Sequence, residues 1–234
     1  MNLLLIILFP LFGAVLPPLA MRLGRIASAW TAAAVTAAAL LLALAPLSLV
    51  FSGAPAEASW AWLPQAGFAI CLRLDGLAAL FVLLILGMGL LIILYAHYYL
   101  ADHEPVGRFY GMLLLFMGAM LGIALSDHLL LLLVFWEMTS LSSFLLISFW
   151  HQRPEARCGA RMALAVTGAG GLAMLAGFLL LAHIVGSYQI SVILAAGDII
   201  RSHPLYAPTL LLILLGAFTK SAQFPFHFWL PHAM

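Results

Sequence analysis

The sequence predicts an all-α integral membrane protein with about seven transmembrane helices. Of its 234 residues, 66% are hydrophobic and 7% are charged, whereas about 25% of the residues in an ordinary soluble domain are charged. The apolar stretches are roughly 18 to 25 residues long, which suits helices that cross a hydrocarbon core of about 30 Å. The strands of a membrane β-barrel would appear as short alternating segments instead.

Seven apolar stretches give these helices in order. They cover residues 2–21, 28–51, 74–99, 109–126, 128–150, 160–185 and 205–224. The first is similar in character to a signal peptide, but its basic residues Arg22 and Arg25 come after it, so we expect a retained helix. Pro225 follows the seventh, and because a proline removes a backbone donor and clashes with the preceding turn, we expect this helix to be broken there.

The arginines predict the orientation of the chain. If the N-terminus is external, six arginines lie on cytoplasmic connections and two lie outside, as the positive-inside rule favours. The six are Arg22, Arg25, Arg108, Arg153, Arg157 and Arg161, and the two are Arg73 and Arg201. The connection 52–73 then lies outside, and its alternation of apolar and polar residues after a Pro64/Gly67 turn predicts a short β-hairpin.

Other motifs exclude several kinds of site. The formal net charge of +1 argues against a nucleic-acid partner. Cys71 and Cys158 form no CxxC, and no HxxxH, HExxH or Cys/His cluster predicts a metal or haem site, so we expect no metal and no cofactor. The stretch "TGAGG", residues 167–171, lies in an apolar span without a preceding strand, which favours close helix packing over a nucleotide loop.

Two charged residues lie inside the predicted spans. Glu137 is about 13 Å along its helix from His128, and Lys220 is about 18 Å from Pro208, so both are expected near mid-membrane depth. Charge at that depth usually marks an ion or proton path. The alternatives are a structural Glu137 satisfied by nearby hydroxyls and a Lys220 that reaches for the interface.

The two charges together predict proton transport. A lysine in low dielectric loses proton affinity and an approaching carboxylate restores it, so a change in the Glu137–Lys220 separation moves a proton. The broken helix beside Lys220 adds a hinge, as in transporters whose discontinuous helices surround the binding site. His227 follows Pro225 and is a candidate to accept this proton, or else a packing histidine.

The stretches "FWEMTSLSSFLLISFW" and "GAFTKSAQFPFHFWLPHAM" resemble the N-terminal half of the large A subunit of Mrp-type multisubunit sodium/proton antiporters, which are related to the antiporter-like subunits of respiratory complex I. The resemblance implies proton-transfer roles for Glu137, Lys220 and His227 and a place in an inverted-repeat bundle. It also implies a secondary-transporter subunit rather than an enzyme, in a bacterial cell membrane, with other membrane subunits as partners and sodium and protons as the transported ions. Residues 1–234 are then one antiporter-like domain that stops before its first repeat is complete.

Two alternatives stay open. A proton-pumping membrane-arm subunit of a complex I-like or hydrogenase-type redox complex is the first. In complex I subunits the glutamate motif is similar to "WEGVGLCSYLLI", whereas this chain reads "WEMTSLSSFLLI". The difference favours the Mrp interpretation. The second is a structural membrane subunit whose buried charges only fix helix register.

Overall fold

The computed structural model describes residues 3–63 and 68–233, in two compact units. The first unit consists of residues 1–59 and 72–125, and the second of residues 60–71 and 126–234. Each strand of a β-hairpin has residues in both units. We describe each unit by itself, and the sequence-based expectation of a single domain stays a prediction.

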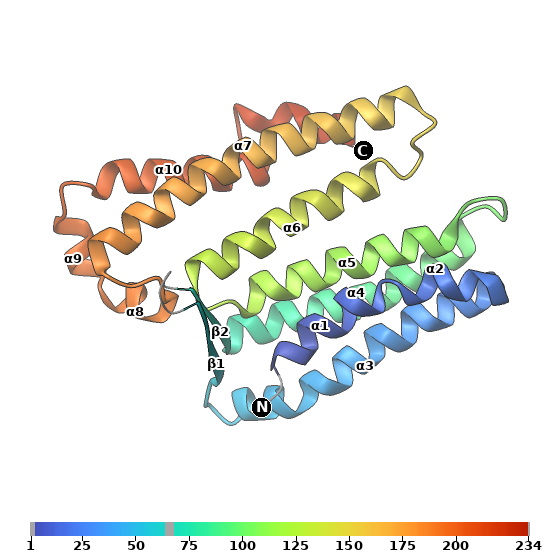
Figure 1. Ribbon diagram of the computed structural model, residues 1–234, viewed down its shortest axis with the longest axis horizontal. Helices are drawn as coiled ribbons and strands as arrows, with labels where there is room; N and C mark the ends of the chain where they lie inside the picture. The colour runs from blue at the N-terminus through green and yellow to red at the C-terminus, as the bar shows by residue number, and fades with distance from the viewer. Residues whose placement is uncertain (1–2, 64–67, 234) are drawn as a thin grey trace. The chain divides into compact units, whose positions relative to one another are not determined.

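The first unit is a bundle of membrane-length helices (Figure 1). Its elements are α1 (Leu3–Gly13), α2 (Leu16–Ala20), the 3-10 helix η1 (Met21–Leu23), α3 (Arg25–Phe51), α4 (Gly76–Tyr99) and α5 (Val106–Leu125). Helix α5 packs against α1, α3 and α4 and is the most buried. Gly111 and Gly118 allow α1 to approach it, because a Cβ atom there would meet Ala14 O at 2.7 Å and Leu11 Cδ2 at 2.6 Å.

Arg25 closes the end of α4 in this unit. Its guanidinium donates to the carbonyl oxygens of His97 at 3.0 Å and Ala101 at 2.7 Å, and also to that of Leu100. The last carbonyl groups of a helix have no hydrogen-bond partner within it, and a positive charge is favourable at that end. Arg25 supplies both the donors and the charge at the C-terminal end of α4. Helix α3 begins at Arg25, directly after Gly24 with a φ of +114° and three residues before the predicted span.

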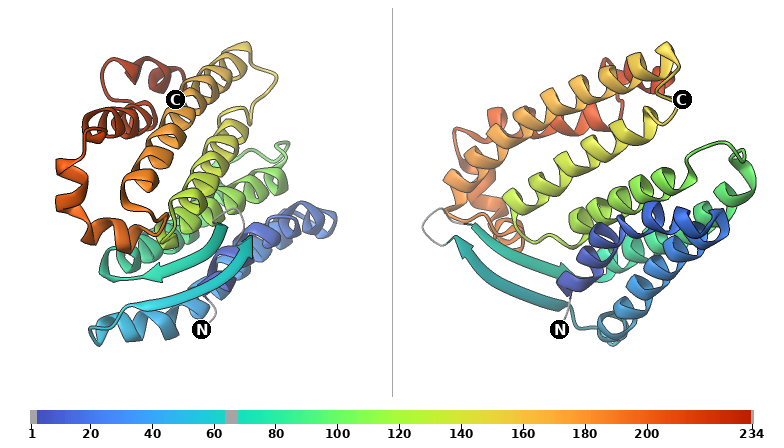
Figure 2. Two further views of the ribbon diagram at one scale, coloured as in Figure 1. Left: turned by 60° about the vertical axis from the view of Figure 1, so that its left-hand side comes forward. Right: turned by 45° about the vertical axis from the view of Figure 1, so that its right-hand side comes forward.

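The second unit is built around α7 (Pro154–Val185), which packs against α6 (Leu129–Ile147) and α10 (Tyr206–Lys220) (Figures 1 and 2). The shorter elements are α8 (Ile190–Ala195), α9 (Gly197–Ser202), the 3-10 helix η3 (Phe226–Phe228) and α11 (Trp229–Ala233). Leu129, Met174, Phe178 and Ile193 form its apolar core. Every element of the candidate site lies in this unit.

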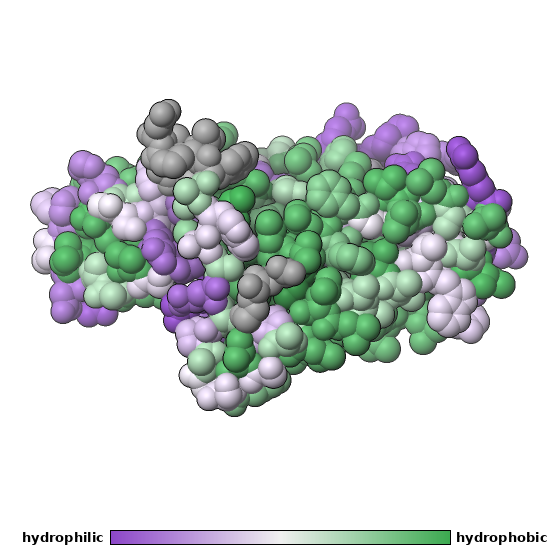
Figure 3. Space-filling view, turned by 60° about the horizontal axis from the view of Figure 1, so that its bottom comes forward, coloured by the Kyte–Doolittle hydropathy of each residue, from purple (hydrophilic) through white to green (hydrophobic). Residues whose placement is uncertain are grey.

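The predicted membrane helices are confirmed. Among the described residues, six helical segments are long and apolar enough to cross a membrane, with Leu3–Leu23 (α1, α2 and η1) counted as one, and α10 is a shorter apolar helix at the seventh predicted position. Figure 3 shows hydrophobic side chains over much of one face, and large ones such as Trp30, Leu84 and Leu91 are exposed. Together with its relatives described below, this makes the chain a multi-pass membrane protein.

The break in the seventh helix begins before Pro225. Helix α10 ends at Lys220, Ala222 has a φ of +52°, and η3 follows Pro225. In a continuous helix the proline ring would clash with the carbonyl four residues earlier, that of Ser221, so the helix has to stop ahead of that residue. The break therefore places Lys220 at a helix end.

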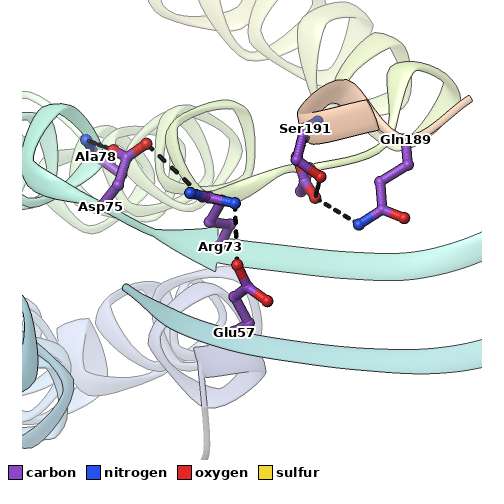
Figure 4. Close-up of polar contacts among 7 residues, drawn as sticks. Glu57, Arg73, Asp75, Ala78, Gln189 and Ser191 are labelled. Atoms are coloured by element: carbon purple, nitrogen blue, oxygen red, sulfur yellow. Dashed lines mark hydrogen bonds and ion pairs between the residues drawn. The ribbon is translucent and has the colours of Figure 1, made fainter. Parts of the chain in front are cut away.

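The predicted hairpin is also present, as strands β1 (Ala56–Leu63) and β2 (Phe68–Leu74) of a two-stranded sheet. The Pro64/Gly67 turn lies outside the described residues. Arg73 pairs with Glu57 at 2.9 Å across the strands, and Asp75 caps α4 by accepting from Ala78 N at 2.9 Å (Figure 4). The strand thus leads directly into the first turn of the helix.

Asp127 joins the start of α6 to the start of α8. Its carboxylate accepts hydrogen bonds from Gln189 Nε2 at 3.0 Å, Ser191 N at 2.9 Å and Ser191 Oγ at 2.8 Å; Gln189 and Ser191 are labelled in Figure 4. Its main-chain N–H donates to Cys71 O at 2.8 Å. Asp127 is 6% exposed, and its donors Gln189 and Ser191 are partly buried.

We expect Asp127→Ala to lower the midpoint of thermal unfolding of the detergent-purified chain. The change leaves partly buried donors without an acceptor, and a fully buried group in that condition costs about 1 to 3 kcal/mol. The control is Asp198→Ala, because Asp198 is fully exposed and its one ion pair among the described residues is with Arg201, at 3.9 Å. Equal midpoints for the two variants would show that the Asp127 contacts do not stabilise this unit.

Candidate proton-transfer site

Glu137 lies on α6 and points at a glycine of α7. A Cβ atom built on Gly171 would lie 1.7 Å from Glu137 Oε1 and 2.8 Å from Cδ, so only a glycine leaves room for this carboxylate. The neighbouring Gly170 makes room in the same way for Thr219 of α10, whose Oγ1 would be 1.8 Å from an added Cβ. The prediction that "TGAGG" serves helix packing is confirmed, and one glycine also shapes the niche of the acid.

Lys220 reaches from the end of α10 to the same turn of α6. Its Nζ donates to Ser140 Oγ at 2.6 Å and to Trp136 O at 3.3 Å. It also lies 5.4 Å from the centroid of the Trp136 ring, within the range of a cation–π contact. Ser140 is 3% exposed, so this ammonium is held by a buried hydroxyl, a carbonyl and an aromatic face.

Glu137 and Lys220 share one turn of α6 without a direct ion pair. No ion pair joins them in the part of the chain that the structure describes. Glu137 Oε1 is buried and has no hydrogen-bond partner there. Both charged groups therefore lie at one turn of α6, with one carboxylate oxygen of Glu137 unpartnered in the described structure and the ammonium of Lys220 held beside it.

The nearby hydroxyls do not satisfy Glu137. Thr139 Oγ1 donates to Trp136 O at 2.7 Å, Ser142 Oγ donates to Met138 O at 2.7 Å, and Ser140 Oγ lies 3.4 Å from Trp136 O. All three use carbonyls of their own helix. The described contacts include no hydrogen bond from these three hydroxyls to the Glu137 carboxylate.

His227 is placed apart from this turn of α6. It lies on η3, is exposed, and stacks on Phe224 with ring centroids 5.8 Å apart. The described contacts include none between His227 and either Lys220 or Glu137. Its role as a proton acceptor stays a prediction.

Trp229 is a residue of the site that sequence reasoning missed. Its Nε1 donates to Thr219 O at 2.9 Å, one of the carbonyls that the helix break releases. Gln223 N, the helical partner that Thr219 O would have, bonds Phe218 O instead at 3.0 Å. A released carbonyl needs such a partner in an apolar setting. No signal in the sequence indicates this contact, which depends on the position of Trp229 after the break.

Two family models match the chain. One described as NADH:quinone oxidoreductase/Mrp antiporter, TM, matches residues 126–234 and so contains the whole site. The other, described as NADH-Ubiquinone oxidoreductase (complex I), chain 5 N-terminus, matches residues 60–110. Residues 126–234 also make up most of the second compact unit.

Curated relatives and a solved structure agree with these models. A probable K(+)/H(+) antiporter A/B subunit from Rhizobium meliloti is 53% identical over 210 residues, 90% of this chain and 21% of the relative. A Na(+)/H(+) antiporter A subunit from Alkalihalophilus pseudofirmus is 49% identical over 189 residues, 80% of this chain and 24% of the relative. The Mrp complex from Dietzia sp. DQ12-45-1b contains a chain that is 36% identical with a TM-score of 0.86, covering 100% of this chain and 25% of that one.

The chain spans less than a quarter of the length of these two curated relatives. The likeness to the Mrp-complex chain covers all of the present sequence, and the family model over residues 126–234 includes both charged residues of the site. It concerns the fold and the membrane character of this portion of the relatives.

Proposed function

We propose that this chain, which belongs to the family of antiporter-like membrane subunits shared by Mrp antiporters and respiratory complex I, serves a multisubunit monovalent cation/proton antiporter as part of its proton path. It belongs to a secondary transporter and catalyses no covalent reaction. Other membrane subunits are its partners, in a bacterial cell membrane. The observation that carries this proposal is the convergence of Glu137 and Lys220 on one turn of α6 beside a broken helix.

The geometry supports a transfer step at Lys220. A protonated lysine in low dielectric is stabilised when a carboxylate approaches and destabilised when it recedes. Lys220 ends a helix, and the break after it gives its backbone freedom that a continuous helix lacks. Small movements of α10 along α6 then change the distance to Glu137, and the lysine takes up or releases its proton accordingly.

Sodium is the proposed counter-ion, and potassium is the competing cation. One relative is named for sodium/proton antiport, and the other, with the qualifier "probable", for potassium/proton antiport. The test uses everted vesicles that contain the complete complex and an imposed pH gradient. Collapse of the gradient by added sodium supports the proposal. Collapse by added potassium alone would show that potassium, and not sodium, is the exchanged cation.

A redox-driven proton pump is the second candidate, because both family models name NADH oxidoreductases. The same vesicles separate the two functions. A complex of this kind would build a pH gradient when given a reductant and a quinone, and it would not respond to added cations. That result would replace the antiporter proposal.

The proposed orientation, with the N-terminus external, is testable at a native cysteine. Cys158 is exposed on α7 at the connection predicted to be cytoplasmic. In intact cells that carry the Cys71→Ser variant, we expect a membrane-impermeant maleimide to label Cys158 only after permeabilisation. The change at Cys71 removes a slower competing thiol, whose pKa is raised by burial and by the charge of Asp127. Labelling of Cys158 from outside intact cells would reverse the orientation.

A further inference from the structure

The contacts of Lys220 define a position for its ammonium that is separate from Glu137. An ammonium has three donors, and two of them are used by Ser140 Oγ at 2.6 Å and Trp136 O at 3.3 Å. The ring of Trp136 provides a third favourable contact, at 5.4 Å. All three groups are neutral and belong to α6, and the lysine is held there while the nearby acid is not its hydrogen-bond partner.

The unsatisfied acid defines the second position. Glu137 lies one residue after Trp136 and three before Ser140, so its carboxylate belongs to the same turn of α6. Its Oε1 is buried without a hydrogen-bond partner in the described structure. A buried carboxylate oxygen in that condition attracts a donor strongly.

The helices around Lys220 bring no other charge to this turn within the described contacts. Helix α7 faces it with Gly170 and Gly171, beside Thr219 and Glu137. The segment after the break carries His227, which stacks on Phe224. The Lys220 ammonium therefore has two competing positions. In one it bonds the Ser140 hydroxyl and the Trp136 carbonyl, and in the other it lies beside the Glu137 carboxylate.

We infer that Ser140 is a positioning residue that, with the Trp136 carbonyl and ring, holds Lys220 away from Glu137 in one stage of the transport cycle. This inference rests on the proposed function and adds to it the neutral site to which the lysine returns. At the neutral site Lys220 releases its proton more readily, and beside Glu137 it retains it. Ser140 thereby sets how often the lysine is in the releasing position.

The test compares Ser140→Ala with two matched variants in the complete complex. Ser140→Thr keeps the hydroxyl. Ser142→Ala removes an equally buried hydroxyl of α6 whose bonds, within the described part of the chain, go to carbonyls of its own helix, those of Met138 and Thr139. The rate of sodium-driven gradient collapse is measured in everted vesicles across a range of pH, with the assembled complex quantified by blotting.

Ser140→Ala is expected to slow exchange about tenfold near neutral pH and to move the rate profile to higher pH by about one unit, as the loss of one hydrogen bond predicts. The sign follows because the deprotonated amine loses the hydroxyl that binds it, whereas the protonated lysine keeps Glu137 as an alternative partner. Ser140→Thr should keep the profile in place, as should Ser142→Ala.

If the pH profile of Ser140→Ala is unchanged, the inference is overturned whatever the exchange rate, because loss of a merely structural serine lowers the rate without moving the profile. A shift to lower pH would overturn it as well. Lys220→Ala in the same vesicles keeps this outcome distinct from a failure of the proposed function. If Lys220→Ala still exchanges normally, the proton path itself is wrong.

Discussion

Lys220→Ala should abolish most cation-driven proton exchange while the complex still inserts and assembles. The ammonium is the group that carries the proton in the proposed step, and the loss of a positioned acid–base group typically costs about 100-fold or more in rate. The measurement is made in everted vesicles, where we expect added sodium to leave the pH gradient of the variant in place. The matched control is Arg201→Ala, because Arg201 is an exposed cation of α9 outside the site.

Glu137→Ala should have nearly the same effect, and Glu137→Asp should retain part of the activity. Alanine removes the carboxylate that stabilises the protonated lysine, whereas aspartate keeps the charge on a shorter side chain. Blotting of the assembled complex separates lost transfer from lost protein. Full activity in assembled Lys220→Ala would show that its ammonium only fixes the position of α10.

The second large effect is expected at Gly171, which carries no charge at all. In Gly171→Ala the new Cβ would lie 1.7 Å from Glu137 Oε1, so the carboxylate or the helix has to move. A misplacement of about 1 Å can cost about 100-fold in a step that depends on positioning. Alanine also forms helices better than glycine, so a loss of activity would not come from a weaker α7.

Gly168→Ala is the matched control for this change. Gly168 lies on the same helix, three residues earlier, and an added Cβ there meets no atom within 4 Å. We expect exchange near the unmodified rate in Gly168→Ala and a strong loss in Gly171→Ala, measured in the same vesicles. Equal activity of the two variants would show that the carboxylate does not need the niche at Gly171.

The sequence allowed the membrane helices and the two charged residues to be predicted, because a charge in a long apolar run is conspicuous and costly. The helix break was predictable from Pro225, since the steric conflict is local. The site of helix termination at Lys220 follows from the same rule applied four residues back. These features depend on short stretches of chain and need no knowledge of how helices pack.

The contacts of the site could not be predicted in the same way. Whether Lys220 meets Ser140 or Glu137 depends on the rotation of α10 against α6, which span boundaries do not determine. Gly171 was predicted to serve packing, but its role as the niche of an acid required the partner side chain. Helices α8 and α9 were missed because six residues each are too few to show a periodic pattern.

Asp127 was passed over for a related reason. It lies at the end of a predicted span, where a carboxylate ordinarily faces water, and its partners are 62 and 64 residues away in the sequence. Trp229 likewise gains its meaning only from the carbonyl of Thr219 that the break releases. Both residues act through contacts between segments that are distant in sequence, and such contacts become visible only with the fold.

The most direct measurement is the sodium-driven collapse of a pH gradient by complexes carrying Glu137→Ala, Lys220→Ala and both changes together. Because the two groups act in one transfer step, we expect each single variant to lose most exchange and the double variant to be little slower than either. Near-normal exchange by an assembled Glu137→Ala complex, or losses that multiply in the double variant, would contradict a shared proton-transfer step.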